Sequence, residues 1–128
     1  MKFVLLYLGD EMHIARLPAA ELERIVAEKT KVTQELAGQG KALGGYRLWP
    51  TAAAARVSRG AGRFATVDGP FAETKDVVGG LDVIQCASRE EAVEWAKRFL
   101  VHDSGLVEVR PVWERCLCHG SYSCSSPI

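Results

Sequence analysis

The segment 68–75, with the sequence DGPFAETK, places acidic, hydroxyl and basic side chains close together between two strand-like runs. Carboxylates serve as general acids or bases, and a lysine ammonium can hold an anionic group. Binding residues often lie on such connections, so Asp68, Phe71, Glu73 and Lys75 are candidates for a ligand site, with Asp68 as the acid or base. The same residues also suit a well-formed turn, in which Asp68 accepts backbone hydrogen bonds and Phe71 anchors the segment. Both interpretations stay open.

A second carboxylate, Asp82, lies in a strand-like run where it shares one face with the apolar residues Ile84 and Cys86. A carboxylate on an apolar face needs a partner, a place near water, or a raised pKa. We therefore consider Asp82 as a residue of a ligand pocket, and weigh that role against a plain ion pair with Arg47 or Arg110.

Other residues complete the hypothesis of a small-molecule cleft. Tyr7, Tyr46 and Trp49 are candidate aromatic walls, and Arg110 is a candidate for binding an anionic group. His13 lies in the loop before the first predicted helix and is a secondary catalytic candidate. The sequence contains no phosphate-binding loop, no Rossmann glycine pattern and no serine-nucleophile elbow, so we expect no cofactor.

The end of the chain holds a cluster of potential metal ligands, namely Cys116, Cys118, His119 and Cys124. Zinc prefers thiolate and imidazole ligands, but structural zinc sites usually use a C-x2-C spacing, whereas this sequence has C-x-C. The surrounding glycine, serine and proline residues are typical of a polar tail. We favour an ordinary tail over residues 115–128 and keep a metal site as the alternative.

The order of the predicted elements indicates the fold of the preceding domain, residues 1–114. Strands are expected at 2–8, 41–49, 55–59, 63–67, 78–87 and 106–113, and helices from Pro18 to Gly38 or Gly40 and from Ser88 to about Leu100. Gly44-Gly45 indicates a bulge or a close backbone approach in the second strand. This order predicts an α+β, ferredoxin-like βαββαβ fold with an inserted β-hairpin, in which an antiparallel sheet carries two helices on one face.

The hydrophobic pattern of the sheet also predicts an assembly. Strands 2–8 and 78–87 are apolar on both faces, yet two helices can cover only one face. The second face would expose more apolar surface than a monomer normally does. We therefore expect a homodimer packed sheet to sheet across a two-fold axis.

Composition excludes some classes of partner. Lys and Arg number 16 and Asp and Glu number 16, which argues against binding to nucleic acid or to an anionic membrane. No apolar run approaches the ~20 residues of a membrane span, and the first residues do not resemble a signal peptide. The clustering of the cysteines also argues against a disulfide framework. We expect a cytoplasmic protein with no nucleic-acid or membrane partner.

Four stretches together resemble the DGPF-domain branch of the YCII-related family, from the first strand to about Glu114. They are the segment 68–75, Gly79-Gly80, the run AVEWA at 92–96 and the run VEVRPVW at 107–113. The resemblance implies a ferredoxin-like α+β fold that dimerises into an α/β barrel. It implies little about chemistry, although some YCII-type relatives are proposed to use a His–Asp pair. A few relatives are enzymes acting on small aromatic or chlorinated compounds, and DGPF members are often linked to alternative sigma-factor systems.

The resemblance transfers only partly to this chain. Asp68 matches the acid of the DGPF motif, but residues 18–37 lack the histidine expected on the first helix, and Glu28, Lys29 and Lys31 occupy that region. Asp82 stands where the family commonly has an aromatic residue. Two functions fit: a dimer that binds a small molecule and uses Asp68 as general acid or base if it is an enzyme, or a non-catalytic interaction or regulatory module linked to sigma-factor-type transcription control.

Overall fold

The computed structural model describes residues 1–71, 75–103, 105–113, 115–116 and 123–124. The chain forms, in order, β1 (Lys2–Gly9), α1 (Glu11–Ala15), α2 (Ala19–Gly38), β2 (Ala42–Arg47), the 3-10 turn η1 (Thr51–Ala53), β3 (Ala55–Gly60), β4 (Arg63–Asp68), β5 (Val77–Gln85), α3 (Arg89–Phe99), β6 (Leu106–Pro111), β7 (Arg115–Cys116) and β8 (Ser123–Cys124).

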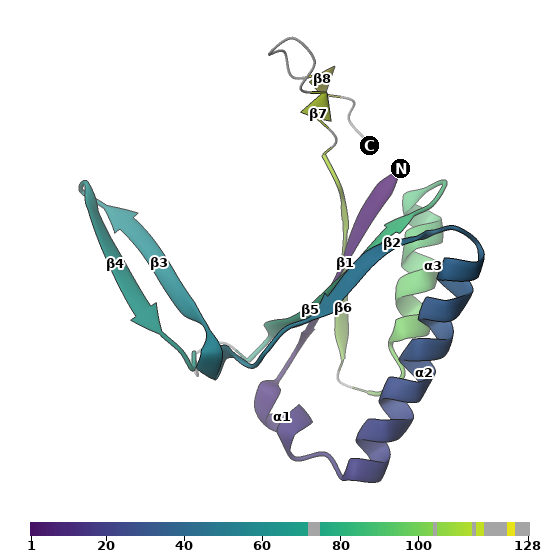
Figure 1. Cartoon of the computed structure of the whole chain (residues 1–128), viewed down its shortest axis with the longest axis horizontal. Helices are drawn as coiled ribbons and strands as arrows, with labels where there is room; N and C mark the ends of the chain where they lie inside the picture. Colours follow the sequence, from purple (N-terminus) through teal and green to yellow (C-terminus); the bar gives the residue numbers. More distant parts are fainter. Residues whose placement is uncertain (72–74, 104, 114, 117–122, 125–128) are drawn as a thin grey trace.

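Four strands form an antiparallel sheet in the order β2-β5-β1-β6, and α2 and α3 lie side by side on one of its faces (Figure 1). The predicted ferredoxin-like fold is therefore confirmed. The inserted hairpin of β3 and β4 is a separate two-stranded sheet, and it projects away on the side of the main sheet opposite the helices. We call this hairpin the β3–β4 arm (residues 55–68). The short strands β7 and β8 pair with each other near the end of the chain.

The two helices follow from local signals in the sequence. In α2, the buried residues Ile25, Val32 and Leu36 recur at helical spacing and face the sheet. In α3, the Ser88 hydroxyl accepts a hydrogen bond from the backbone N–H of Glu91 at 3.2 Å, and the Glu91 carboxylate accepts one from the N–H of Ala87 at 2.7 Å. The bond to Ser88 satisfies an N–H group that the first turn leaves unpaired, and the bond to Glu91 reaches back to the residue before the cap, so the two side chains form a variant of the capping box.

The core lies between the helices and the sheet. Alternation in β1 turns Phe3 and Leu5 toward the helices, where they are fully buried with Ile84 of β5, Leu36 of α2 and Phe99 of α3. Completely burying a side chain of this size stabilises the fold by about 1.5–3 kcal/mol. The core therefore holds α2 and α3 in a fixed position above the strands.

Two local features differ from the expectation, and a third confirms it. The loop after β1 contains a short helix, α1, which Asp10 caps by accepting a hydrogen bond from the Met12 N–H. The hairpin turn consists of two residues rather than three, because β3 includes Gly60 and only Ala61 and Gly62, both with positive φ, remain between the strands. The expected irregularity in β2 is present as a register shift between Ala42 and Gly44.

The start of segment 68–75 joins the arm to the main domain. A Cβ added to Gly69 would lie 1.7 Å from the Thr51 carbonyl oxygen, so only glycine fits this contact. Thr51 in turn donates hydrogen bonds from its N–H and its hydroxyl to the Glu11 carboxylate, at 2.6 and 2.7 Å. Phe71 is buried, and the Arg56 guanidinium lies 3.7 Å from the centre of its ring. These contacts connect the base of the arm with η1 and α1.

Candidate functional site

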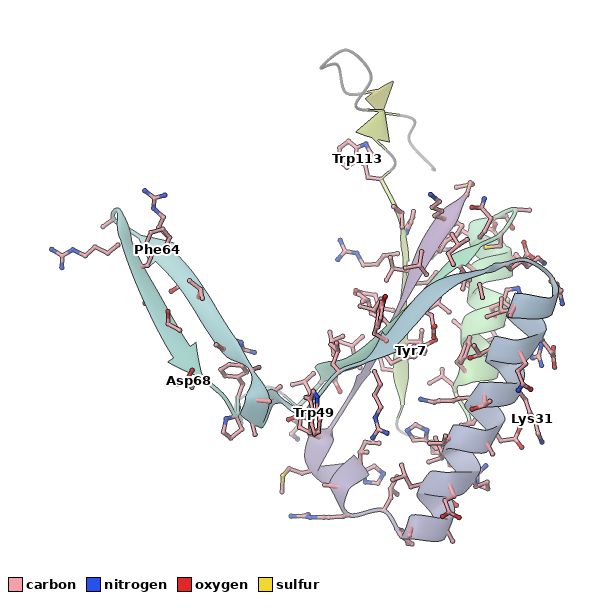
Figure 2. All side chains as sticks on the ribbon, viewed as in Figure 1. Tyr7, Lys31, Trp49, Phe64, Asp68 and Trp113 are labelled. Carbon is pink, nitrogen blue, oxygen red and sulfur yellow. The ribbon has the colours of Figure 1, made fainter. Side chains whose placement is uncertain are left out.

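A cleft of about 940 Å³ opens between α2, α1 and strands β1, β2 and β5. A volume of this size is typical of small-molecule sites. In Figure 2, Tyr7 lies on the sheet inside this region and Trp49 lies where the chain leaves β2. Most of the lining is apolar, and we call its inner part the apolar wall (Leu8, Ile14, Leu17, Leu22, Ile25 and Phe99).

A carboxylate and a phenol meet on the sheet surface that faces this cleft. The Tyr7 hydroxyl of β1 donates a hydrogen bond to Asp82 Oδ2 of β5, with an O–O distance of 2.5 Å. The neighbouring strand β2 leaves room for the pair, because Gly45 pairs with Asp82 in the sheet and a Cβ there would lie 1.8 Å from Asp82 Oδ1. Gly45 thus allows a close backbone approach to the carboxylate, one of the two features that Gly44-Gly45 indicated in the sequence.

The surroundings shift both groups toward their neutral forms. Burial raises the pKa of the Asp82 carboxyl above its ordinary value, although the hydrogen bond from Tyr7 and the charge of Lys29 act in the opposite direction. Burial also raises the pKa of the Tyr7 hydroxyl far above its usual range, and the neighbouring Asp82 adds to this shift. Tyr7 therefore remains a hydrogen-bond donor, while Asp82 is the group of the pair that can gain or lose a proton.

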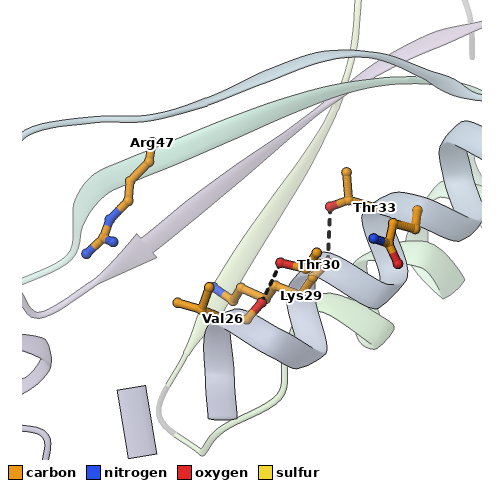
Figure 3. Close-up of a pocket in the computed structure, with 6 residues that line it drawn as sticks. Val26, Lys29, Thr30, Thr33 and Arg47 are labelled. Carbon is orange, nitrogen blue, oxygen red and sulfur yellow. Dashed lines mark hydrogen bonds between the residues drawn. The ribbon is translucent and has the colours of Figure 1, made fainter. Parts of the chain in front are cut away.

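Two cations face the cleft from opposite sides. Lys29 projects from α2, with its ammonium 5.2 Å from the centre of the Tyr7 ring, and Arg47 projects from the end of β2 (Figure 3). Burial lowers the pKa of Lys29, and the positive charge of Arg47 lowers it further. The site thus combines one shifted carboxyl group with two positively charged side chains.

A histidine lies at the edge of the same cleft. His102 follows α3, and its Nδ1 atom is buried with no hydrogen-bond partner among the described residues. Burial lowers the pKa of His102, and the charges of Lys29 and His13 add to this shift. The imidazole is therefore favoured in its neutral form, in which one ring nitrogen can accept a hydrogen bond.

The structure gathers some of the predicted residues and separates others. Asp82 and Tyr46, together with Tyr7 and Trp49, line the cleft. The expected ion pair of Asp82 with Arg47 or Arg110 is not formed in the described part of the chain, where the Tyr7 hydroxyl is the partner of Asp82.

The residues of segment 68–75 lie elsewhere. Asp68 is exposed at the end of β4, on the arm and away from Tyr7 (Figure 2), and Phe71 is buried beneath Arg56. Lys75 is exposed, and Glu73 lies outside the described residues.

The two remaining predicted site residues are also exposed, and neither belongs to the lining of the described cleft. Arg110 lies on β6, and His13 lies on α1. The roles predicted for Asp68, His13 and Arg110 therefore stay predictions, and they do not share the site formed by Asp82.

Two residues that line the cleft, Lys29 and His102, were not among the site candidates predicted from the sequence. Lys29 was named only as part of the helix region that lacks the expected histidine, and the signal for its role is a charge between the buried positions Ile25 and Val32 of α2. His102 was not considered as a site residue, because its place at the cleft depends on the packing of segments far apart in the chain and has no local sequence signal.

The zinc alternative is not tested, because Cys118 and His119 lie outside the described residues. Within the described ranges, no cluster of three or more His, Cys, Asp or Glu side chains could hold a metal ion. Among the helices of these ranges, none has the length and apolar character that crossing a membrane requires.

Comparison with known proteins places the chain in a family. The model of the YCII-related domain matches residues 1–115. The chain belongs to the YCII-related family. An uncharacterised protein of Rhizobium meliloti (strain 1021) is 35% identical over 114 residues, which cover 88% of this chain and 92% of that protein. In this YCII-related chain, Lys29 lines the cleft, whereas Glu28 and Lys31 of the same helix region do not belong to the described lining.

Proposed function

We propose that this YCII-related protein binds a small organic molecule in the cleft and that Asp82 exchanges a proton with it. The observation that carries the proposal is a half-buried carboxyl group with a raised pKa, held by a phenol inside a largely apolar cleft. A titratable group shifted by burial in a concave site is a recognised mark of acid–base function.

The roles within the site follow from the chemistry of each group. In its ionised form Asp82 takes a proton from the ligand, and in its protonated form it returns one. Tyr7 donates to the carboxylate throughout and so fixes its orientation. Lys29 supplies a positive charge beside the pair, which stabilises negative charge that forms on the ligand.

A thermal-shift screen of small organic acids, phenols and neutral aromatics tests this function, using the wild type with Asp82→Asn and Asp68→Asn. We expect some compounds to raise the melting temperature of the wild type and of Asp68→Asn. In Asp82→Asn, the rise in melting temperature should depend on pH in a different way. Incorporation of deuterium from D2O into bound compounds, followed by NMR, then reports proton exchange and should be lost in Asp82→Asn. If Asp68→Asn alone removes binding, the acid or base is Asp68, as the sequence suggested. If nothing binds, the non-catalytic interaction module is favoured.

We also propose that the protein is a homodimer that buries the uncovered face of the sheet. Residues of β1 and β5 that alternate with the core residues, such as Leu6 and Val83, point away from the helices and are only half-buried. On the arm, Val57 is 67% exposed and Phe64 is 72% exposed. An isolated two-stranded hairpin is marginally stable in water, so a second copy that contacts both the sheet face and the arm explains both features.

The mass of the protein in solution tests the dimer. Analytical ultracentrifugation should give twice the mass of one chain for the wild type, and Leu6→Glu should shift the species toward a monomer because it places a charge on the proposed interface. Thr30→Glu, on the exposed side of α2, is the matched control and should leave the mass unchanged. A wild-type monomer at micromolar concentration would contradict the dimer.

A further inference from the structure

Lys29 and Arg47 lie at a passage between two hollows. Both line the main cleft and also an adjoining hollow of about 320 Å³, which α2 forms with the end of β2. Figure 3 shows Arg47 projecting from β2 and Lys29 projecting from α2, and both residues line this hollow. The core holds α2 in place, and pairing with β5 holds β2, so the fold positions the backbones that carry the two cations.

The positive charge at this passage is only partly compensated. Within the described residues, neither Lys29 nor Arg47 forms an ion pair with a carboxylate. Glu11 also lines the cleft, but its carboxylate is occupied by the hydrogen bonds from Thr51. The charge of Arg47 opposes protonation of Lys29, and only Asp82 acts in the other direction. An anion between the two cations would relieve this repulsion.

The charge balance limits the anion to a single negative charge. Of the carboxyl groups that line the described cleft, Asp82 is the one whose charge acts on Lys29, so two cations face one ionisable carboxyl group at this point. A dianion such as a phosphate monoester would bring excess negative charge close to Asp82, whereas a carboxylate would balance the site. A planar carboxylate also matches the paired N–H groups of an arginine.

The rest of the cleft selects an apolar body. Beyond the cations, the space is bounded by the apolar wall and by the Tyr7 ring, and its volume of about 940 Å³ exceeds what a small ion fills. Removing apolar surface from water lowers the free energy of the complex. The cleft therefore favours a ligand with an aromatic or branched hydrocarbon group.

We propose that the ligand is an aromatic or branched carboxylic acid whose carboxylate lies between Lys29 and Arg47 and whose hydrocarbon body packs on the apolar wall. This inference rests on the proposed function, because it assigns a chemical class to the molecule bound in the same cleft. It does not depend on whether Asp82 exchanges a proton.

Isothermal titration calorimetry with 2-naphthoate and the neutral 2-naphthamide tests the inference, because the two probes share one hydrocarbon body. The naphthoate should bind roughly tenfold more tightly, as expected for a charge-assisted hydrogen bond. Lys29→Met and Arg47→Gln should each reduce the naphthoate affinity to near that of the amide and leave the amide affinity unchanged. Lys31→Met is the matched control, because Lys31 lies on the exposed side of the same helix and pairs with Glu28 (Figure 2).

The outcomes separate the two proposals. Equal affinities for the acid and the amide, unaffected by Lys29→Met and Arg47→Gln, would overturn the inference and leave the proposed function standing. Displacement of naphthoate by equimolar inorganic phosphate would overturn the carboxylate assignment. Binding of neither probe at millimolar concentration would overturn the inference, and the thermal-shift screen then decides the proposed function separately. If added salt weakens the binding of naphthoate and leaves the binding of the amide unchanged, the role of the two cations is supported.

Discussion

The contact between Tyr7 and Asp82 makes a measurable contribution to the stability of the fold. Tyr7→Phe removes the hydroxyl that lies 2.5 Å from Asp82 Oδ2 and keeps the ring in the core. A hydrogen bond to a charged group is worth about 1.5–3 kcal/mol, and water can replace part of it because Asp82 is half-buried. We therefore expect a loss of about 1–2 kcal/mol at pH 7, which lowers the melting temperature by about 5 °C for a domain of this length.

The pH dependence of this loss identifies its cause. Because the pKa of Asp82 is raised in the fold, the contribution of Asp82 to stability is fully present below its unfolded pKa and is lost as pH rises through its folded pKa. The Tyr7 hydroxyl favours the ionised carboxylate and so limits this loss. Tyr7→Phe should therefore lower the free energy of unfolding more at pH 7 than near pH 4, which is close to the ordinary pKa of ~3.9 for aspartate.

Urea unfolding at both pH values, in the wild-type and Asp82→Asn backgrounds, measures this coupling as a double-mutant cycle. The cost of Tyr7→Phe should fall in the Asp82→Asn background, where the acceptor is neutral. Tyr46→Phe is the matched control, because Tyr46 is 74% exposed, and it should be nearly neutral. An equal cost of Tyr7→Phe at both pH values and in both backgrounds would refute the reasoning.

Three further predictions concern the framework of the site, and urea unfolding measures each of them. Gly45→Ala should cost about 1–3 kcal/mol because its Cβ would overlap Asp82 Oδ1, whereas Gly38→Ala, with no atom within 4 Å, should not destabilise; equal effects would contradict the steric account. Leu36→Ala should cost about 2–5 kcal/mol through the cavity left in the core, and a cost below 1 kcal/mol would be inconsistent with its burial. Ser88→Ala should cost about 1 kcal/mol through loss of the cap on α3, and no change would show that the cap is dispensable.

The sequence predicted the fold well because the signals that specify it are local. Helical spacing in α2 and the Ser88 cap of α3 depend on residues a few positions apart. The short helix α1 was missed because it holds no buried residue and so leaves no apolar stripe to recognise.

The site was harder to predict, because its members are far apart in the chain. Strand periodicity placed Asp82 on an apolar face, and the structure gives it the partner that such a carboxylate requires. It did not identify Tyr7 as that partner, since the contact depends on the register between β1 and β5. Lys29 and His102 reach the cleft only through the packing of α2 and α3 on the sheet. In contrast, the motif that drew attention to Asp68 is where the arm is attached to the domain.

The protonation of Asp82 in the presence of a ligand tests the account most directly. Carbon-13 NMR of the aspartate carboxyl groups, followed from pH 3 to pH 9 with and without 2-naphthoate, reports the pKa of this residue in the folded protein. We predict that the pKa of Asp82 lies above the ordinary aspartate value of ~3.9 and changes when naphthoate binds, while the Asp68 signal does not respond to the ligand. An Asp82 pKa at or below the ordinary value, or a ligand response at Asp68 instead of Asp82, would contradict the account.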